Sequence, residues 1–200
     1  MSVLLFEAPH LPVDLTAAAR YMRTPREIPE ITALLCEVER ETAPLCTLRL
    51  CYRRVRVIHT ETGVEIEGFS LPSHDLARHL ANCNEAVLLA ATAGLALDRY
   101  IVREGRISPA RALCAQAIGT ERVEALCDAF CAQMNEMLKS EGTHLTPRFS
   151  PGYGDLPLTA QHALFALLSP EKHVGVTLTD TLLMSPTKSV SAIAGIEVLT

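Results

Sequence analysis

Apolar residues in the first part of the chain recur at intervals of three and four positions, which is the period of an amphipathic helix. Over residues 27–42 this spacing predicts a helix with one apolar face, ended by Pro44. A shorter helix is predicted over residues 13–22. Pro25 is expected to end it, because proline disfavours the helical conformation of the residue before it. The chain therefore begins with two predicted helices.

The period changes to two beyond residue 46. Apolar and polar side chains alternate over residues 46–59, which is the pattern of a strand with one buried face. A turn at Glu61-Thr62-Gly63 and a second strand over residues 64–68 complete a predicted hairpin. The polar positions of the first strand include a run of arginines, which we interpret as a solvated strand face: Arg49, Arg53, Arg54 and Arg56.

The pattern from residue 73 to residue 138 is predicted to be helical throughout. Its longest apolar run, residues 86–97, is about twelve residues long, short of the ~20 that span a bilayer, so we predict a buried helix there. Ser108-Pro109 predicts a helix start, with proline at the first helical position. Thr120 is expected to cap a further helix, with Glu121 and Glu124 in its first turn.

The C-terminal third alternates between loop, helix and strand patterns. Residues 140–157 are rich in glycine and proline and are predicted to form a loop, followed by a short helix over residues 158–168. Two strands, residues 173–184 and 188–198, are predicted to be joined by Ser185-Pro186-Thr187. Helices between hairpins indicate the α+β class.

We therefore expect one domain over residues 1–200, in which helices cover a twisted antiparallel sheet. Residues 1–45 would supply the N-terminal helices. Residues 46–200 would supply the sheet, the central helices and the ligand loop.

Charge and cysteine content narrow the class of protein. The formal net charge of -5 argues against a nucleic-acid binder, and no segment is long and apolar enough to span a membrane. Seven cysteines, an odd number without a Cys-x-x-Cys pair, indicate reduced thiols and a cytoplasmic protein. Cys127 and Cys131 lie one helical turn apart, but no further ligands follow at a usual spacing, so we expect no metal.

The loop over residues 146–155 has the composition of a binding site. It combines Arg148, whose guanidinium can clamp a carboxylate, with Tyr153, two prolines and two glycines. A rigid structural loop is the alternative reading of this composition. Gly152-x-Gly154 does not complete a dinucleotide-binding fingerprint because Pro157 stands at the third glycine position, so a Rossmann methyltransferase is disfavoured.

The hexapeptide Arg148-Phe149-Ser150-Pro151-Gly152-Tyr153 resembles the Arg-x-x-x-Gly-Tyr motif with which activation domains of cobalamin-dependent methionine synthase hold S-adenosylmethionine. Residues 158–168, 174–179, 184–186 and 188–192 resemble the same family in order and spacing. The similarity covers about a third of the chain, from Asp128 to Gly195. It implies the fold of that family.

The resemblance also implies roles for individual residues. Arg148 would bind the methionine carboxylate, the backbone around Ser150 to Gly152 would face the adenosine, and Tyr153 would complete the wall. Asp128 corresponds to an acid that contacts the ligand, although it could equally be an exposed polar residue. For the N-terminal acid of the family's site, Asp14 is the candidate. The implied site comprises Asp128, Arg148, Phe149, Ser150, Pro151, Gly152 and Tyr153.

The sequence has no Asp-x-His-x-x-Gly cobalamin motif and no zinc-thiolate triad, so it has no complete active site of its own. The resemblance implies an activation subunit that binds S-adenosylmethionine and supports the reductive remethylation of cobalamin, which it meets only through a partner. That partner would be a cobalamin-binding methionine synthase subunit or another corrinoid protein, served by a flavodoxin-like reductant. The alternatives are a sensor or accessory module for another corrinoid methyltransferase, and a structural relative that binds no ligand.

Overall fold

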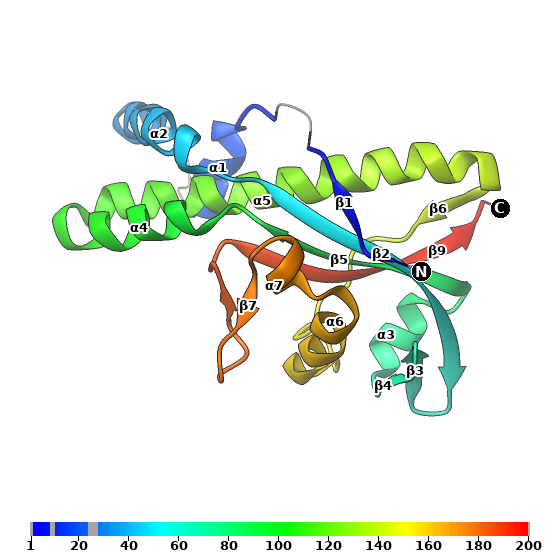
Figure 1. Ribbon diagram of the computed structural model, residues 1–200. Helices are drawn as coiled ribbons and strands as arrows, with labels where there is room; N and C mark the ends of the chain where they lie inside the picture. The colour runs from blue at the N-terminus through cyan, green and yellow to red at the C-terminus, as the bar shows by residue number, and fades with distance from the viewer. Residues whose placement is uncertain (1, 9–10, 24–27, 200) are drawn as a thin grey trace.

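The computed structural model describes residues 2–8, 11–23 and 28–199, and its centre is a curled antiparallel sheet (Figure 1). The strand order is β4-β3-β2-β5-β9-β6, and β1 pairs with the first residues of β2. The strands are β1 (Leu4–Phe6), β2 (Arg49–Thr60), β3 (Gly63–Ile66), β4 (Phe69–Leu71), β5 (Cys83–Thr92), β6 (Thr143–Leu145) and β9 (Ser189–Val198). A separate small hairpin pairs β7 (Thr177–Leu178) with β8 (Met184–Ser185).

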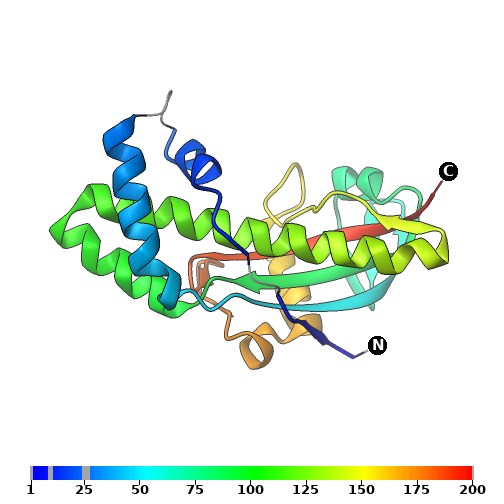
Figure 2. The same cartoon turned by 90° about the horizontal axis from the view of Figure 1, so that it is seen from above.

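Helices cover both faces of this sheet. The long helix α5 lies along one face, and α3 and α6 pack on the other (Figures 1 and 2). The helices are α1 (Leu15–Tyr21), α2 (Pro29–Thr42), α3 (His74–His79), α4 (Leu95–Ile107), α5 (Pro109–Leu138), α6 (Gln161–Leu168) and α7 (Pro170–His173). Three 3-10 turns, η1 (Ala43–Leu45), η2 (Lys139–Glu141) and η3 (Leu158–Ala160), extend them. Within the described residues no helix has the length and apolarity needed to cross a bilayer.

A helical arm extends beyond one end of the sheet (Figures 1 and 2). We use this name for α1, α2, α4 and the N-terminal half of α5, which share their own apolar core. The α+β class and the helix-covered antiparallel sheet predicted from the sequence are confirmed. The sheet and the arm meet along α5, so this one helix spans both parts of the molecule.

The buried helix predicted over residues 86–97 is wrong, because most of this run is the central strand β5. Val87 and Leu89 face the core under α5, whereas Leu88 and Ala90 face the core under α3 and α6. A strand buried on both faces carries apolar residues at every position, so its period of two is invisible in the sequence.

The prediction of helix throughout residues 73–138 is accordingly wrong as well. The segment contains α3, β5, α4 and α5. The helix start at Ser108-Pro109 is confirmed, with Ser108 at the N-cap position of α5. Thr120 caps no helix. It lies within the 30-residue α5, and its hydroxyl donates a hydrogen bond to the carbonyl of Gln116 at 3.0 Å. A hydroxyl that bonds back four residues satisfies itself without ending the helix.

The N-terminal predictions hold where the structure describes them. Helices α1 and α2 lie within the predicted ranges, and the β2–β3 hairpin follows them. The proposed stop at Pro25 and the start at Glu27 fall outside the described residues. Pro44 lies inside η1, a 3-10 turn that directly follows α2, and the short strand β4 was not predicted.

At the C-terminus the predicted pairing of residues 173–184 with residues 188–198 is wrong. The first range forms part of the β7–β8 hairpin, and the second is β9, which lies between β5 and β6. The predicted loop over residues 140–157 includes part of η2 and strand β6, and the helix after it is η3 followed by α6. Because β6 is short, it pairs with only the last part of β9.

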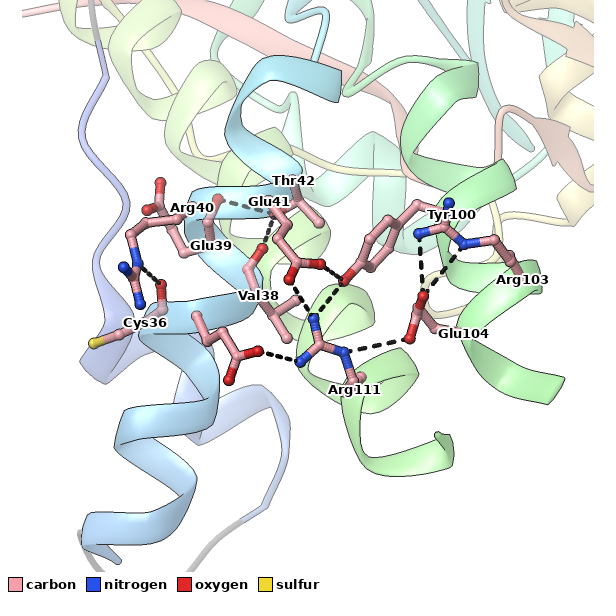
Figure 3. A network of polar contacts seen from close by, with 11 residues as sticks. Cys36, Val38, Glu39, Arg40, Glu41, Thr42, Tyr100, Arg103, Glu104 and Arg111 are labelled. Atoms are coloured by element: carbon pink, nitrogen blue, oxygen red, sulfur yellow. Dashed lines mark hydrogen bonds and ion pairs between the residues drawn. The ribbon is translucent and has the colours of Figure 1, made fainter. Parts of the chain in front are cut away.

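One arginine clamps the helical arm together (Figure 3). The Arg111 side chain on α5 is 19% exposed, and each of its three nitrogens has a partner. Nη1 lies 2.7 Å from Glu37, Nη2 lies 2.7 Å from Glu41, and Nε lies 3.3 Å from Glu104. The Tyr100 hydroxyl donates to Glu41 at 2.7 Å and accepts from Arg111 Nη2 at 3.3 Å. The cluster joins α2, α4 and α5.

Candidate functional site

A cavity of about 560 Å³ opens beside the edge of β9 that β6 leaves uncovered. It is walled by α5, the loop after β6, α6 and the β7–β8 hairpin. Its lining residues are Glu124, Arg148, Ser150, Pro151, Tyr153, Leu158, Gln161, Leu182, Leu183, Met184, Thr187, Ser189, Val190 and Ser191. The sequence-predicted loop therefore supplies one wall of a site that four other segments complete.

The loop over residues 146–157 is fixed at both ends. Near its start, Phe149 forms an isolated bridge with Ile193, exchanging two backbone hydrogen bonds of 2.8 Å. At its end, the Asp155 carboxylate accepts hydrogen bonds from the Ser73 hydroxyl and from the backbone N–H of His74 at 2.8 Å. Hydrogen bonds to the ionised form, the Ser73 bond first, lower the pKa of Asp155. The loop is therefore anchored to β9 and to the start of α3.

Two glycines between these anchors are required by the backbone. Gly152 has φ of +93°, and its N–H donates to the Leu156 carbonyl at 2.9 Å, closing a tight turn. Gly154 has φ of +53°, and a Cβ there would overlap the Asp75 carboxylate. The loop conformation therefore depends on glycine at both positions.

The Arg148 guanidinium is held from one side only. Nη2 lies 2.8 Å from Glu124 Oε2 and 3.0 Å from Asp128 Oδ1. Nη1 is shielded from solvent and has no hydrogen-bond partner among the described residues. The side chain as a whole is 20% exposed. Arg148, which lines the cavity, is thus oriented by two acids on α5 and has one nitrogen without a partner among the described residues.

The two acids lie four residues apart, on the same face of α5. Burial raises the pKa of Asp128. The Asp128 side chain is nevertheless 74% exposed, and its Oδ1 lies 3.0 Å from the guanidinium. Two carboxylates beside one guanidinium leave net negative charge, which is the complement of a cationic group.

Helix α1 brings a tyrosine towards the same acids. Burial raises the pKa of Tyr21, and the negative charges of Glu124 and Asp128 raise it further. Asp14, the candidate N-terminal acid, caps α1: its Oδ1 accepts from the backbone N–H of Thr16 at 2.8 Å and of Ala17 at 3.0 Å. The Asp14 carboxylate is therefore engaged with its own helix.

The opposite wall offers hydrogen-bond acceptors. Gln161 is 4% exposed; its Nε2 donates to the Leu182 carbonyl at 3.1 Å, and its Oε1 has no partner among the described residues. On β9, the backbone N–H and C=O of Ile193 point away from β5 and bond to Phe149. The backbone groups of every second residue in a strand point to the same edge, so those of Ser191 also point to this uncovered edge. A polar ligand would find backbone and side-chain partners on both walls.

The seven sequence-predicted site residues take different positions. Four line the cavity: Arg148, Ser150, Pro151 and Tyr153. Asp128 meets Arg148, Gly152 forms the turn, and Phe149 packs towards the core, its ring 5.2 Å from His79 and 6.2 Å from Tyr153.

Sequence reasoning missed Glu124 and Gln161 as site residues. Glu124 precedes Asp128 by one helical turn, and Gln161 stands at the start of a mostly apolar helix, so both positions could have been noticed in the sequence. The β7–β8 hairpin left no signal, because only the fold brings it to the cavity. Tyr21 left none either, because only the fold brings it near Glu124 and Asp128.

The cysteines contribute no reactive group to this site. All seven are free thiols. Burial raises the pKa of Cys51 and of Cys131 to about 11 each, so both are protonated near neutral pH. Among the described residues no cluster of three histidine, cysteine, aspartate or glutamate side chains is placed to hold a metal ion.

Two comparisons with known proteins find a similar sequence segment and a similar fold. The model described as "Vitamin B12 dependent methionine synthase, activation domain" matches residues 123–197. The crystal structure of the MetH reactivation domain bound to AdoHcy matches with a TM-score of 0.71 and 18% sequence identity, over 98% of this chain and 78% of that chain. No curated protein matches in a sequence search. The family resemblance expected from the sequence is confirmed.

Proposed function

From the fold of the methionine synthase activation domain, which this chain has, and from the match of residues 123–197 to that family, we propose that the protein binds S-adenosylmethionine in the cavity beside Arg148. We further propose that residues 1–200 act as one activation module for a cobalamin-binding partner. That partner is a methionine synthase subunit or another corrinoid protein. The structural relative, the MetH reactivation domain, was crystallised with AdoHcy.

The observation that carries this proposal is the unpartnered Nη1 of Arg148 beside the cavity. A shielded donor without a partner costs about 1–3 kcal/mol, more for a charged group. A ligand carboxylate would remove this cost by accepting a charge-assisted hydrogen bond. The amino-acid portion of S-adenosylmethionine carries such a carboxylate.

The charges around Arg148 fit the rest of the amino-acid group. Glu124 and Asp128 offer two carboxylates, which suit an ammonium and the nearby sulfonium. Tyr153 on the rim provides an aromatic face for a cation or a base. The Gln161 Oε1 and the Ser191 backbone on the other wall provide partners for the polar edges of a nucleoside. The residues present therefore suit each portion of this ligand.

The chain's own residues bind and orient the ligand and supply no acid–base chemistry. When bound, S-adenosylmethionine supplies a methyl group for transfer to the cobalamin of the partner. The two acids fix the guanidinium, and the anchored loop fixes Ser150 to Tyr153. Positioning of this kind can provide much of the rate of a group transfer.

Calorimetric titration with S-adenosylmethionine tests the proposal. Wild-type protein should bind, and Arg148→Lys should weaken binding nearly as much as Arg148→Ala, because lysine keeps the charge but loses the planar fork. Loss of a charge-assisted hydrogen bond of roughly 1.5–3 kcal/mol corresponds to about ten- to a hundredfold weaker binding. Neither change should alter folding much, since the two acids paired with Arg148 are 36% and 74% exposed and remain hydrated without it.

The matched control is Arg54→Lys. Arg54 also pairs with two acids, Glu85 and Glu141, but lies on β2 outside the cavity. This control should bind the ligand as the wild type does. If wild-type protein shows no binding, the chain is a structural relative without the ligand. If the Arg148→Lys variant binds normally, the carboxylate clamp is wrong.

A further inference from the structure

The outward face of α4 combines exposed apolar residues with arginines. Leu95, Val102 and Ile107 are exposed, Ile107 to 71%. Together with Arg99, Arg103 and Arg106 they border a shallow groove of about 460 Å³. The inward face of the same helix packs in the core of the arm through Leu97 and Ile101. In Figure 1, α4 runs from the end of the sheet to the tip of the arm.

Like strand β2, which carries four arginines, this face gathers positive charge in a chain that is acidic overall. The protein has 23 acidic and 18 basic side chains, yet three arginines gather along one 13-residue helix. Arg103 is engaged with Glu104 and lies over the Tyr100 ring at 5.1 Å. Arg99 and Arg106 have no ion-pair partner among the described residues. Apolar side chains framed by unpaired charge mark surfaces that bind partners.

The α4 face adjoins the ligand cavity. Asp98, in the first turn of α4, borders the groove, and its carboxylate holds Thr187. The Thr187 N–H and hydroxyl donate to it at 2.6 and 2.9 Å. Thr187 itself lines the cavity. A protein seated on α4 would therefore lie next to the site that holds the methyl donor.

We propose that this α4 face is the docking surface for the corrinoid-binding partner, which meets it with acidic side chains around an apolar centre. The inference rests on the proposed function, since that function supplies the need for a partner beside the cavity. Charge complementarity selects an acidic occupant. A second copy of the chain fits poorly, because two-fold symmetry would bring arginines against arginines.

The test measures binding to a purified, cobalamin-loaded methionine synthase subunit from the same organism. The charge-reversal variant is Arg99→Glu/Arg106→Glu, and the matched control is Arg56→Glu/Lys172→Glu, which makes the same charge change at exposed residues outside both cavities. The α4 variant should bind the subunit at least about tenfold more weakly at 50 mM salt, and the difference should shrink at 500 mM as charges are screened. The control should bind as the wild type does.

Titration with S-adenosylmethionine separates this inference from the proposed function. Both variants should bind the ligand like wild type, because neither changes a residue of the cavity. Unchanged affinity of the α4 variant for the subunit, or no binding of the subunit by a wild-type protein that does bind ligand, would overturn the docking surface alone. Binding to phosphatidylserine vesicles, or dimerisation that the α4 variant abolishes, would assign the face to a membrane or to a second copy and also overturn it.

Discussion

Two arginines in this protein have similar exposure and similar acidic surroundings but different partners. The Arg111 side chain is 19% exposed and the Arg148 side chain is 20% exposed. Arg111 uses all three nitrogens, bonding residues of α2 and α4. Arg148 pairs through Nη2, and its Nη1 has no partner among the described residues.

The difference shows what each cluster does. A guanidinium whose nitrogens are all bonded within the fold holds helices together and has no nitrogen left to bind a ligand. A guanidinium fixed at one nitrogen and unpaired at another, beside a cavity, is pre-organised for a ligand. Burial and charge alone do not distinguish these roles. The saturation of the hydrogen-bonding groups does.

The largest expected effect on stability comes from Arg111→Ala. This change leaves the buried Glu104 with only Arg103 and separates α2 from α4 and α5. We expect a loss of about 3 kcal/mol, because the change removes one of the two cationic partners of a buried carboxylate and also breaks two ion pairs to α2. For a chain of this size the melting temperature should fall by roughly 6–12 °C. Denaturation by heat and by urea measures it.

The ligand affinity of the folded Arg111→Ala protein should stay within about twofold of wild type. Arg111 shares no partner with the residues of the cavity, and mutations at such independent sites usually do not affect each other. A large loss of affinity together with the fall in melting temperature would contradict the division between the two clusters.

A smaller effect is expected from Gly154→Ala, and it should reduce the affinity for the ligand. The new Cβ would meet the Asp75 carboxylate at a left-handed backbone position, which costs about 1–3 kcal/mol. Because Gly154 adjoins the Asp155 anchor, we expect S-adenosylmethionine affinity to drop by about tenfold or more. Gly105→Ala is the control: a Cβ there meets open space, and both properties should be retained.

The smallest expected effect is a pH dependence of the Arg111 cluster. The pKa of Glu41 lies below its ordinary 4.5 because Tyr100, and then Arg111, hydrogen-bond the ionised carboxylate. When the pKa of a carboxyl group is lower in the folded than in the unfolded protein, the ionised group stabilises the fold. This stabilisation is complete at a pH above the pKa of the unfolded state and is lost as the pH falls through the pKa of the folded state. The destabilisation caused by Glu41→Gln should therefore be visible at pH 7 and fade as the pH falls below 4.5.

Melting curves from pH 3 to pH 7 measure this dependence. The control Glu61→Gln removes an exposed carboxylate at the β2–β3 turn and should show no such trend. An effect of Glu41→Gln that is equally large at pH 3 would mean that the clamp does not depend on the ionised carboxylate.

Local patterns in the sequence were enough for part of the fold. The N-terminal helices, the β2–β3 hairpin and the start of α5 at Pro109 follow from spacing, turns and proline, all of which act over a few residues. Strand β5 and the pairing of β9 were missed. Their burial on both faces and their non-local partners leave no period to detect.

The site divides in the same way. The loop around Arg148 was visible because its residue types are rare in combination. The partners of Arg148 were only partly visible, since Asp128 rested on resemblance and Glu124 went unnoticed as its neighbour one turn away. That Nη1 is unpaired and that Gln161 faces the same cavity follow only from tertiary packing.

The most direct test of the account is the melting temperature of three proteins with and without S-adenosylmethionine: wild type, Arg111→Lys and Arg148→Lys. At a ligand concentration 100 times Kd, binding stabilises by about 2.7 kcal/mol, so the wild type should melt roughly 5–10 °C higher. Without ligand, the Arg111→Lys protein should melt at a lower temperature than the wild type, and the ligand should raise its melting temperature by the same amount. Without ligand, the Arg148→Lys protein should melt at the wild-type temperature, and the ligand should raise that temperature only a little. A full rise for Arg148→Lys, or no rise for Arg111→Lys, would contradict the assignment of one arginine to the ligand and the other to the fold.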